Sequence, residues 1–176
     1  MLAQVSSASE RFNALAVREK WPTLCDERLD FDSDRLAELL DIWQSVRGTR
    51  RLPQRADFSA RVLTRHLQHL TFVDRLSAAD GARRYRFRLF GSALARHTGD
   101  LTGKFLDEAI PAIFLPSWIA SYDTAIEMRV PLRFTARFRA AHLEHIMAET
   151  LAAPLADASG AASGLLVSVN YSPVVA

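Results

Sequence analysis

The chain has 176 residues, of which 49% are hydrophobic and 24% are charged. This length fits one domain, because about 70% of the unfolded surface can be buried at this size, and the composition excludes a disordered or collagen-like chain. The 22 basic residues face 20 acidic ones, which leaves a net charge of only +2. Acidic residues are interleaved with the basic ones along the chain, which argues against nucleic-acid binding.

Cys25 is the single cysteine, so no disulfide forms within the chain and no thiolate metal cluster can assemble. No apolar run approaches the ~20 residues that a membrane-spanning helix needs. Glu10 and Arg11 stand where a signal peptide would need its apolar segment. These features predict a cytoplasmic protein without a membrane anchor.

The first elements in the chain are two helices. Ser7 followed by Glu10 is a capping-box pattern, and Trp21-Pro22 ends the helix that it starts. We expect residues 1–32 to form an N-terminal helical extension, through which two copies could pair as a homodimer.

The second helix is expected from about Asp34 to Arg47, where an apolar stripe of Leu36, Leu40 and Trp43 recurs at helical spacing. This stripe either covers the core of the domain or forms an interaction face.

From Leu70 onward the hydrophobic period changes to two, which indicates strands. Strands are expected over 70–76, 85–90, 132–139, 142–155 and 165–171, and a long helix over 117–129. Within the second strand Tyr85 and Phe87 alternate with arginines, so one face is apolar and the other is cationic. The predicted order is a helix, two strands, a helical crossover and three strands.

Several short motifs occur in the same order as this pattern. They are Leu39-Leu40-x-x-Trp43, Arg47-Gly48, Pro53-x-Arg55-x-Asp57, His69-Leu70, Tyr85-Arg86-Phe87-Arg88-Leu89-Phe90-Gly91, Gly99, Thr102-Gly103, and Glu149 with Pro154-Leu155. Together they resemble a family of short, stand-alone bacterial PAS-like proteins over about residues 35–173. The resemblance implies an α+β fold with a PAS-like five-stranded antiparallel sheet, helices on one face and an added N-terminal helical segment. The PAS-like domain would then span residues 33–176.

The resemblance implies a non-catalytic sensory or regulatory domain that binds a small ligand, a protein partner or both, and it carries over no catalytic residue. The predicted long helix contains no histidine, and Cys25 lies outside the resemblance, so haem and covalently bound flavin are both disfavoured as cofactors. In His142-x-x-His145 the rings point to opposite faces of a strand, so we expect no metal site there.

The strand over 142–155 carries two ionisable residues, His145 and Glu149, in the same alternation as Met147 and the leucines. One hypothesis is that this face points inward, so that His145, Glu149 and Met147 line a ligand pocket with Tyr85, Phe87 and Phe134. The favoured alternative is a structural ion pair, with Glu144 and Arg137 as the visible partners, because strand register slips easily near a turn.

Two other function classes stay open from the sequence. A small enzyme would use His145 and Glu149 as acid and base, and a purely structural interaction module would fill its core with the large aromatic side chains. The arginines of the second strand are expected to be solvated or paired with acids, which Glu38 and Asp41 of the second helix could supply.

Overall fold

The computed structural model describes residues 7–77, 81–137 and 146–173. The α-helices are α1 (Ala8–Arg18), α2 (Asp34–Arg47), α3 (Ala60–Leu63), α4 (Ser92–Thr98), α5 (Leu106–Ala109) and α6 (Leu115–Met128), with two 3-10 turns, η1 (Arg55–Asp57) and η2 (Leu67–His69). The strands are β1 (Thr23–Asp26), β2 (Leu70–Ser77), β3 (Arg83–Phe90), β4 (Leu132–Arg137), β5 (Ile146–Ala156) and β6 (Ala162–Pro173).

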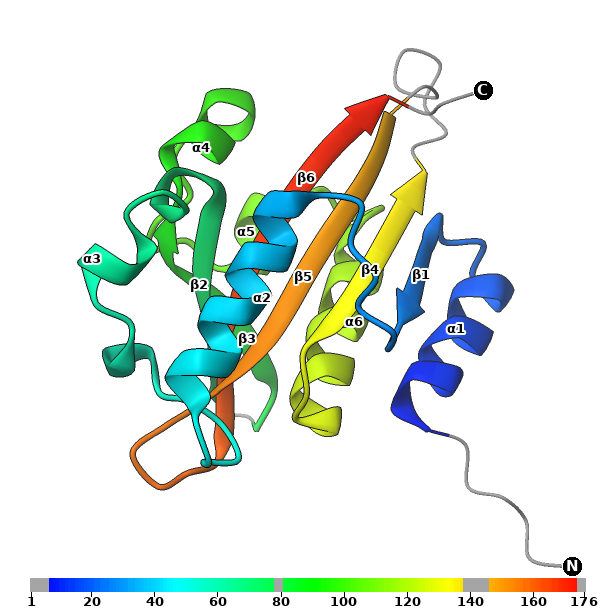
Figure 1. Cartoon of the computed structure of the whole chain (residues 1–176). Helices are drawn as coiled ribbons and strands as arrows, with labels where there is room; N and C mark the ends of the chain where they lie inside the picture. The colour runs from blue at the N-terminus through cyan, green and yellow to red at the C-terminus, as the bar shows by residue number, and fades with distance from the viewer. Residues whose placement is uncertain (1–6, 78–80, 138–145, 174–176) are drawn as a thin grey trace, which may run out of the picture.

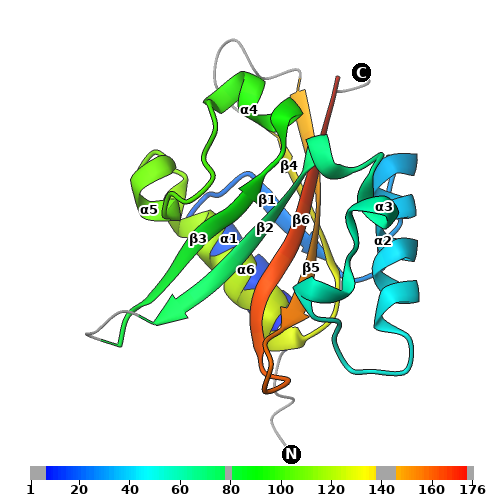
Figure 2. The same cartoon turned by 90° about the vertical axis from the view of Figure 1, so that its left-hand side faces the viewer.

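The six strands form one antiparallel sheet in the order β1-β4-β5-β6-β2-β3. Helix α2 packs on β5 and β6 from one side of the sheet, and α6 packs on the same two strands from the other side (Figure 1, Figure 2). The predicted PAS-like α+β fold is therefore confirmed. The structure adds a sixth strand, β1, and places the leading helix α2 on the sheet face opposite α6.

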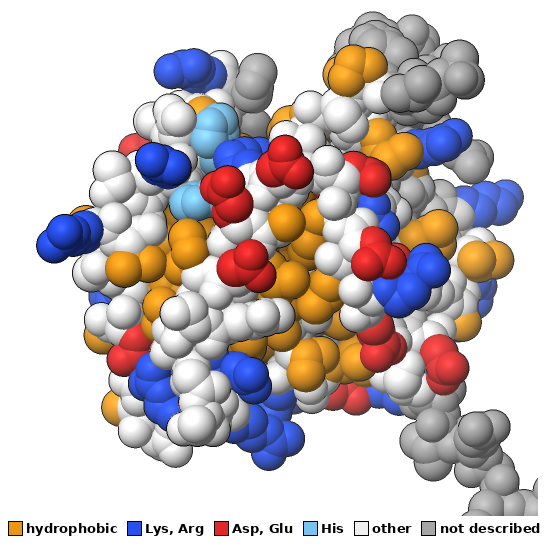
Figure 3. All heavy atoms as spheres, in the orientation of Figure 1, with side chains coloured by type: hydrophobic (Ala, Val, Ile, Leu, Met, Phe, Trp, Pro, Cys, Tyr) orange, Lys and Arg blue, Asp and Glu red, His pale blue; other side chains and the backbone are white. Residues whose placement is uncertain are grey.

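Helix α2 binds the sheet through the predicted apolar stripe. Leu36, Leu40 and Trp43 are all buried, and the indole N–H of Trp43 donates to the carbonyl oxygen of Pro154 on β5 at 3.1 Å. Gly48 ends the helix with a φ of 56°, a conformation that glycine adopts without steric cost. The stripe is thus used within this chain. The outer surface of α2 carries the exposed acids Asp34, Glu38 and Asp41, and acidic side chains gather over the helix in Figure 3.

The N-terminal segment is part of the same sheet. Ser7 and Glu10 form the predicted capping box of α1, and Phe12 from this helix packs edge-on against Phe134 of β4 at 5.3 Å between ring centroids. Strand β1 extends the sheet by pairing with β4. The apolar side of α1 is therefore occupied within the chain, while the domain boundary at residue 32 and a dimer through the N-terminal helices remain predictions.

Candidate functional site

Glu149 on β5 lies directly beneath the start of α2. Its side chain is buried, and its two carboxylate oxygens accept the backbone N–H groups of Asp32 at 2.9 Å and Ser33 at 3.0 Å. The same carboxylate accepts the Nε–H of Arg133 on β4 at 2.7 Å. A carboxylate at a helix N-terminus is stabilised both by free N–H groups and by the helix dipole. These contacts match the structural alternative for Glu149, with Arg133 as the partner in place of Arg137.

Arg133 extends this cluster to two further carboxylates. Its guanidinium lies 3.5 Å from Asp26 on β1 and 3.1 Å from Asp32 before α2. Arg35 adds a neighbouring set of contacts, because its guanidinium donates to the Ser168 hydroxyl and the Val169 carbonyl of β6, both at 2.9 Å. Through these contacts, the start of α2 is linked to four strands, namely β1, β4, β5 and β6.

The six predicted pocket residues do not lie together. Glu149 and Met147 lie on the α2 face of β5, whereas Tyr85, Phe87 and Phe134 belong to the face covered by α1 and α6. His145 lies outside the described residues. The expectation that Glu149 shares an inward face with Phe134 is therefore wrong. The physical reason is that helices cover both faces of β5, so hydrophobic side chains occur at both alternations.

Aromatic side chains pack closely on the α6 face. The Tyr85 and Tyr122 rings meet edge-on with their centroids 5.3 Å apart, and Trp118 continues the row at 6.1 Å from Tyr122. Phe87 meets Phe90 in the same geometry at 5.3 Å. These distances lie within the range that favours edge-to-face aromatic pairs. The predicted residues Tyr85, Phe87 and Phe134 thus contribute to a packed aromatic layer.

An open hollow of about 530 Å³ lies beside the C-terminal end of α6, and we call it the α6 hollow. Its lining consists of Arg75, Arg83, Asp123, Ile126, Glu127, Arg129 and Ala162. The buried Tyr85 reaches this lining, because its hydroxyl donates to the Asp123 carboxylate at 2.6 Å. Burial and then the bond to Asp123 raise the pKa of Tyr85 far above its usual value. Tyr85 therefore remains a hydrogen-bond donor at any physiological pH.

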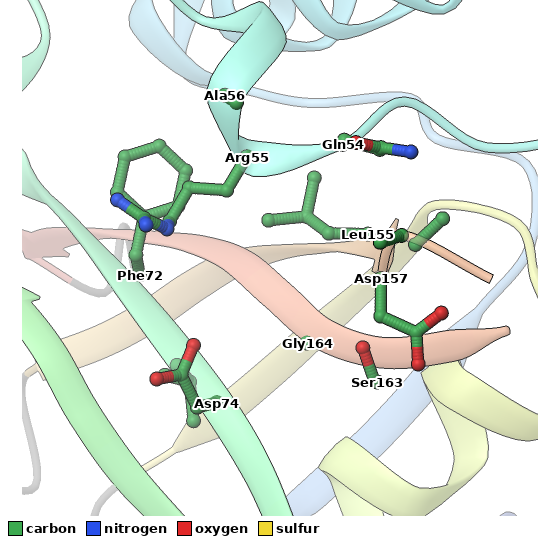
Figure 4. A pocket seen from close by; sticks show the side chains of 12 residues that line it. Gln54, Arg55, Ala56, Phe72, Asp74, Leu155, Asp157, Ser163 and Gly164 are labelled. Atoms are coloured by element: carbon green, nitrogen blue, oxygen red, sulfur yellow. The ribbon is translucent and has the colours of Figure 1, made fainter. Parts of the chain in front are cut away.

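A second hollow of about 230 Å³ lies on the other side of the sheet, and we call it the η1 hollow. Turn η1 forms one wall, while β2, β6 and the end of β5 form the others (Figure 4). Phe72 and Leu155 contribute apolar side chains, Val73 contributes backbone, and Arg55 and Asp74 contribute charged side chains. Arg55 occurs in the Pro53-x-Arg55-x-Asp57 motif, which is the one sequence signal for this hollow.

The cationic row of β3 is neutralised by nearby acids. Arg84 binds Asp107 of α5 at 2.8 Å, and the same guanidinium contacts Glu108 at 3.0 Å. Arg86 and Arg88 both lie against Asp74 of β2, at 3.4 and 3.6 Å. Pairing with acids was expected, but the acids come from α5 and β2, so the assignment of that role to Glu38 and Asp41 is wrong.

The fold and the sequence agree on one family. A family model described as a PAS domain matches residues 31–169. The chain belongs to the PAS domain family. A search of curated proteins finds no match. A solved structure described as that of an RNA-binding Light-Oxygen-Voltage receptor is similar with a TM-score of 0.39 and 16% identity, over 67% of this chain and 35% of that one. This chain thus spans about a third of the receptor that it matches.

PAS domains are sensory and regulatory modules. The sequence of this one predicts only part of the residues that line its hollows. Asp123 and the C-cap residue Arg129 of α6 and Arg75 of β2 carry no motif, because the helix and the strand lie far apart in the sequence and meet only in the folded chain. Among the described residues, no group of three or more histidine, cysteine, aspartate or glutamate side chains is arranged to hold a metal ion. Burial, followed by the charges of Glu27 and Asp26, raises the pKa of Cys25 to about 12.

In the part of the chain that the structure describes, no helix combines the length and the apolar character needed to span a membrane.

Proposed function

We propose that this PAS domain is a non-catalytic regulatory module that binds a small, charged polar ligand in the α6 hollow. The hollow offers guanidinium groups from three elements, Arg75 of β2, Arg83 of β3 and Arg129 at the end of α6, together with the carboxylates of Asp123 and Glu127. A ligand with several polar groups suits such a lining, because charge-assisted hydrogen bonds are the strong ones.

The observation that carries this proposal is the hydrogen bond between Tyr85 and Asp123. Tyr85 is buried in the aromatic layer on β3, and Asp123 lies on α6 in the wall of the hollow. A ligand that binds Asp123 or displaces it would break the hydrogen bond from Tyr85, which links the core of the sheet to α6. Binding in the hollow is thereby linked to the relative position of the sheet and its long helix, as a regulatory output requires.

Native mass spectrometry of gently purified protein tests the proposal. We expect a species heavier than the chain alone, and we expect that species to be lost in the double variant Arg83→Gln/Arg129→Gln. The matched control is Arg51→Gln/Arg61→Gln, which removes the same charge from exposed positions outside the hollow. An added mass that both double variants retain would place the ligand elsewhere, and its absence from the unmodified chain would contradict tight ligand binding.

A second candidate function is the docking of a protein partner. Ile113, Phe114 and Trp118 at the start of α6 are 77%, 41% and 37% exposed, and aromatic side chains of this kind are enriched at interface hot spots. The Trp118 ring also contacts Tyr122, which leads into the aromatic layer.

An enzyme that uses Glu149 as acid or base is the weakest of the candidates. Glu149 is buried beneath α2, and donors from Asp32, Ser33 and Arg133 occupy three of the about four acceptor positions of its carboxylate, so little of the group is open to a substrate.

A further inference from the structure

The η1 hollow has the chemistry of a binding site for a small organic acid. We propose that it binds a carboxylate with a compact apolar body, and that Arg55 holds the carboxylate. The site lies on the sheet face opposite the α6 hollow and is independent of the function proposed there. Its volume of about 230 Å³ corresponds to roughly eight water molecules. It lies below the ~300 Å³ at which pockets for drug-sized ligands begin, so the ligand is small.

The floor of the hollow is apolar. The side chains of Phe72 on β2 and Leu155 on β5 form it, and they are 6% and 3% exposed. Gly164 of β6 completes the floor, because a Cβ atom at this position would lie 2.9 Å from the carbonyl oxygen of Val73. Strands β2 and β6 therefore approach closely at Gly164. An apolar ligand body that covers this floor gains burial of its own surface.

The charged groups around the floor differ in whether they already have hydrogen-bond or ion-pair partners. Asp74 lies between the guanidinium groups of Arg86 and Arg88, at 3.4 and 3.6 Å. Asp157 accepts hydrogen bonds from the Ser159 N–H at 2.8 Å, the Ser159 hydroxyl at 2.6 Å and the Ala161 N–H at 3.1 Å. Both carboxylates thus already have donors.

Arg55 is the charged group of this lining whose side chain has no partner among the described residues. Its guanidinium makes no ion pair and no side-chain hydrogen bond with any residue in the described ranges. In Figure 4 it extends from η1 on the side of the hollow opposite Asp74 and Asp157. A guanidinium presents a planar pair of donors that matches a carboxylate, which is why we assign an organic acid and not a cation to this site.

The turn that presents Arg55 is held on both sides. The Ala156 N–H donates to the Pro53 carbonyl at 2.9 Å, and Gln54 pairs with Ala156 as an isolated β-bridge. On the other side Asp57 accepts the Gln54 N–H and binds Arg50, both at 2.7 Å. The backbone of η1 is therefore fixed before a ligand arrives, and preorganisation of this kind lowers the entropic cost of binding.

Residue-resolved NMR titration of the 176-residue chain with benzoate tests the site, with benzyl alcohol as the neutral probe of similar shape. We expect benzoate to shift the amide signals of Phe72, Val73 and Gly164, and benzyl alcohol to bind at least tenfold more weakly. Arg55→Gln should weaken benzoate binding by about ten- to a hundredfold, the effect of one lost charge-assisted pair. Arg51→Gln, an exposed change in the same segment, should leave it unaltered.

Three results would overturn the assignment. They are benzoate shifts confined to residues outside the η1 hollow, equal binding of benzoate and benzyl alcohol, and an Arg55→Gln variant that binds benzoate as well as the unmodified chain. Because Arg55 is exposed and has no partner in the described residues, the spectrum of this variant should otherwise overlay that of the unmodified protein. The same spectra distinguish this site from the α6 hollow. Neither benzoate nor the Arg55→Gln substitution should shift the amide signal of Asp123, which lines the α6 hollow.

Discussion

The carboxylate of Glu149 on β5 and the guanidinium of Arg133 on β4 form a buried ion pair of 2.7 Å beneath the first turn of α2. Their side chains are only 4% and 13% exposed. Burying such a pair is costly unless the remaining hydrogen-bonding positions are filled. Here the N–H groups of Asp32 and Ser33 donate to the carboxylate, and Asp26 and Asp32 accept from Arg133, so the pair is tied to the start of a helix.

Replacing Glu149 by glutamine should lower the free energy of unfolding by about 3 kcal/mol, because it leaves the Arg133 charge buried without its main partner. Urea unfolding measures this loss. The double variant Glu149→Gln/Arg133→Gln should lose less than the sum of the single variants, since the two residues are in contact. Ligand content should stay the same in all variants. Unchanged stability of Glu149→Gln would refute a structural role for the pair.

Trp43 is the principal anchor of α2, since it is 2% exposed and hydrogen-bonded to Pro154. Trp43→Ala should cost about 3 to 5 kcal/mol of stability, a large share of the total for a domain of this size. Trp43→Phe should cost less, because it keeps most of the packing and loses the indole N–H. Thermal unfolding compares the two variants with Gln44→Ala at the adjacent exposed position, which should leave the melting temperature unchanged.

Much of the fold follows from local signals that act over a few residues. The stripe from Leu36 to Trp43 predicts the position of α2, and the alternation around Tyr85 indicates β3, because the side-chain periods of helix and strand are visible in the sequence. The order of these elements resembles that of the PAS family. Strand β1 gave no such signal, since four residues are too few to show an alternation and its pairing with β4 is a long-range contact.

The candidate site was harder to predict for a related reason. In β5 the neighbours Leu151, Ala152 and Ala153 are all buried, because α2 covers one face and α6 the other. Periodicity therefore cannot tell which helix Glu149 faces. The partner of Glu149 depends on the register between β4 and β5, which places Arg133 opposite Leu151. No local pattern around Arg133 encodes that register.

The sequence alone predicts that residues 1 to about 30 are dispensable for folding of the sheet domain. The contacts of the N-terminal segment lead to a different expectation for a chain that starts at residue 27. Phe12 would no longer cover Phe134, and β4 would become an exposed edge strand. We expect a lower melting temperature and greater self-association, because unpaired edges favour pairing between chains.

Asn13 provides a point mutation that tests the same contact. Its side-chain amide both donates to and accepts from the backbone of Cys25, at 2.9 and 2.8 Å, and so covers part of the outer edge of β1. Asn13→Ala should cost about 1 to 3 kcal/mol through the lost hydrogen bonds. Differential scanning calorimetry measures the melting temperatures of the Asn13→Ala variant and of the shortened chain, and size-exclusion chromatography measures the self-association of the shortened chain. A shortened chain that melts at the original temperature would support the expectation from sequence instead.

Stability should also depend on pH through His66, the buried N-cap residue of η2, whose imidazole lies near Glu38 of α2. Burial is the main cause that lowers its pKa below 6.5, and the charges of Arg35 and Arg65 lower it further, whereas Glu38, with a carboxylate oxygen 3.7 Å from Nε2, raises it. Burial lowers the pKa of His69 as well, with added effects of Arg35, Arg96 and His66. The unfolded chain therefore binds protons more readily than the folded one in this pH range.

The sign of the effect follows from that difference. The contribution of His66 is fully present above the unfolded pKa of about 6.5 and is lost as the pH falls from there toward the folded pKa. His66→Phe should flatten the dependence of unfolding free energy on pH between about 7 and 5, because it removes the titrating group. Glu38→Gln should steepen it, because the remaining neighbours then lower the pKa of His66 further. Urea unfolding at several pH values distinguishes the two variants, and equal slopes in both would show that His66 does not govern the acid sensitivity of this domain.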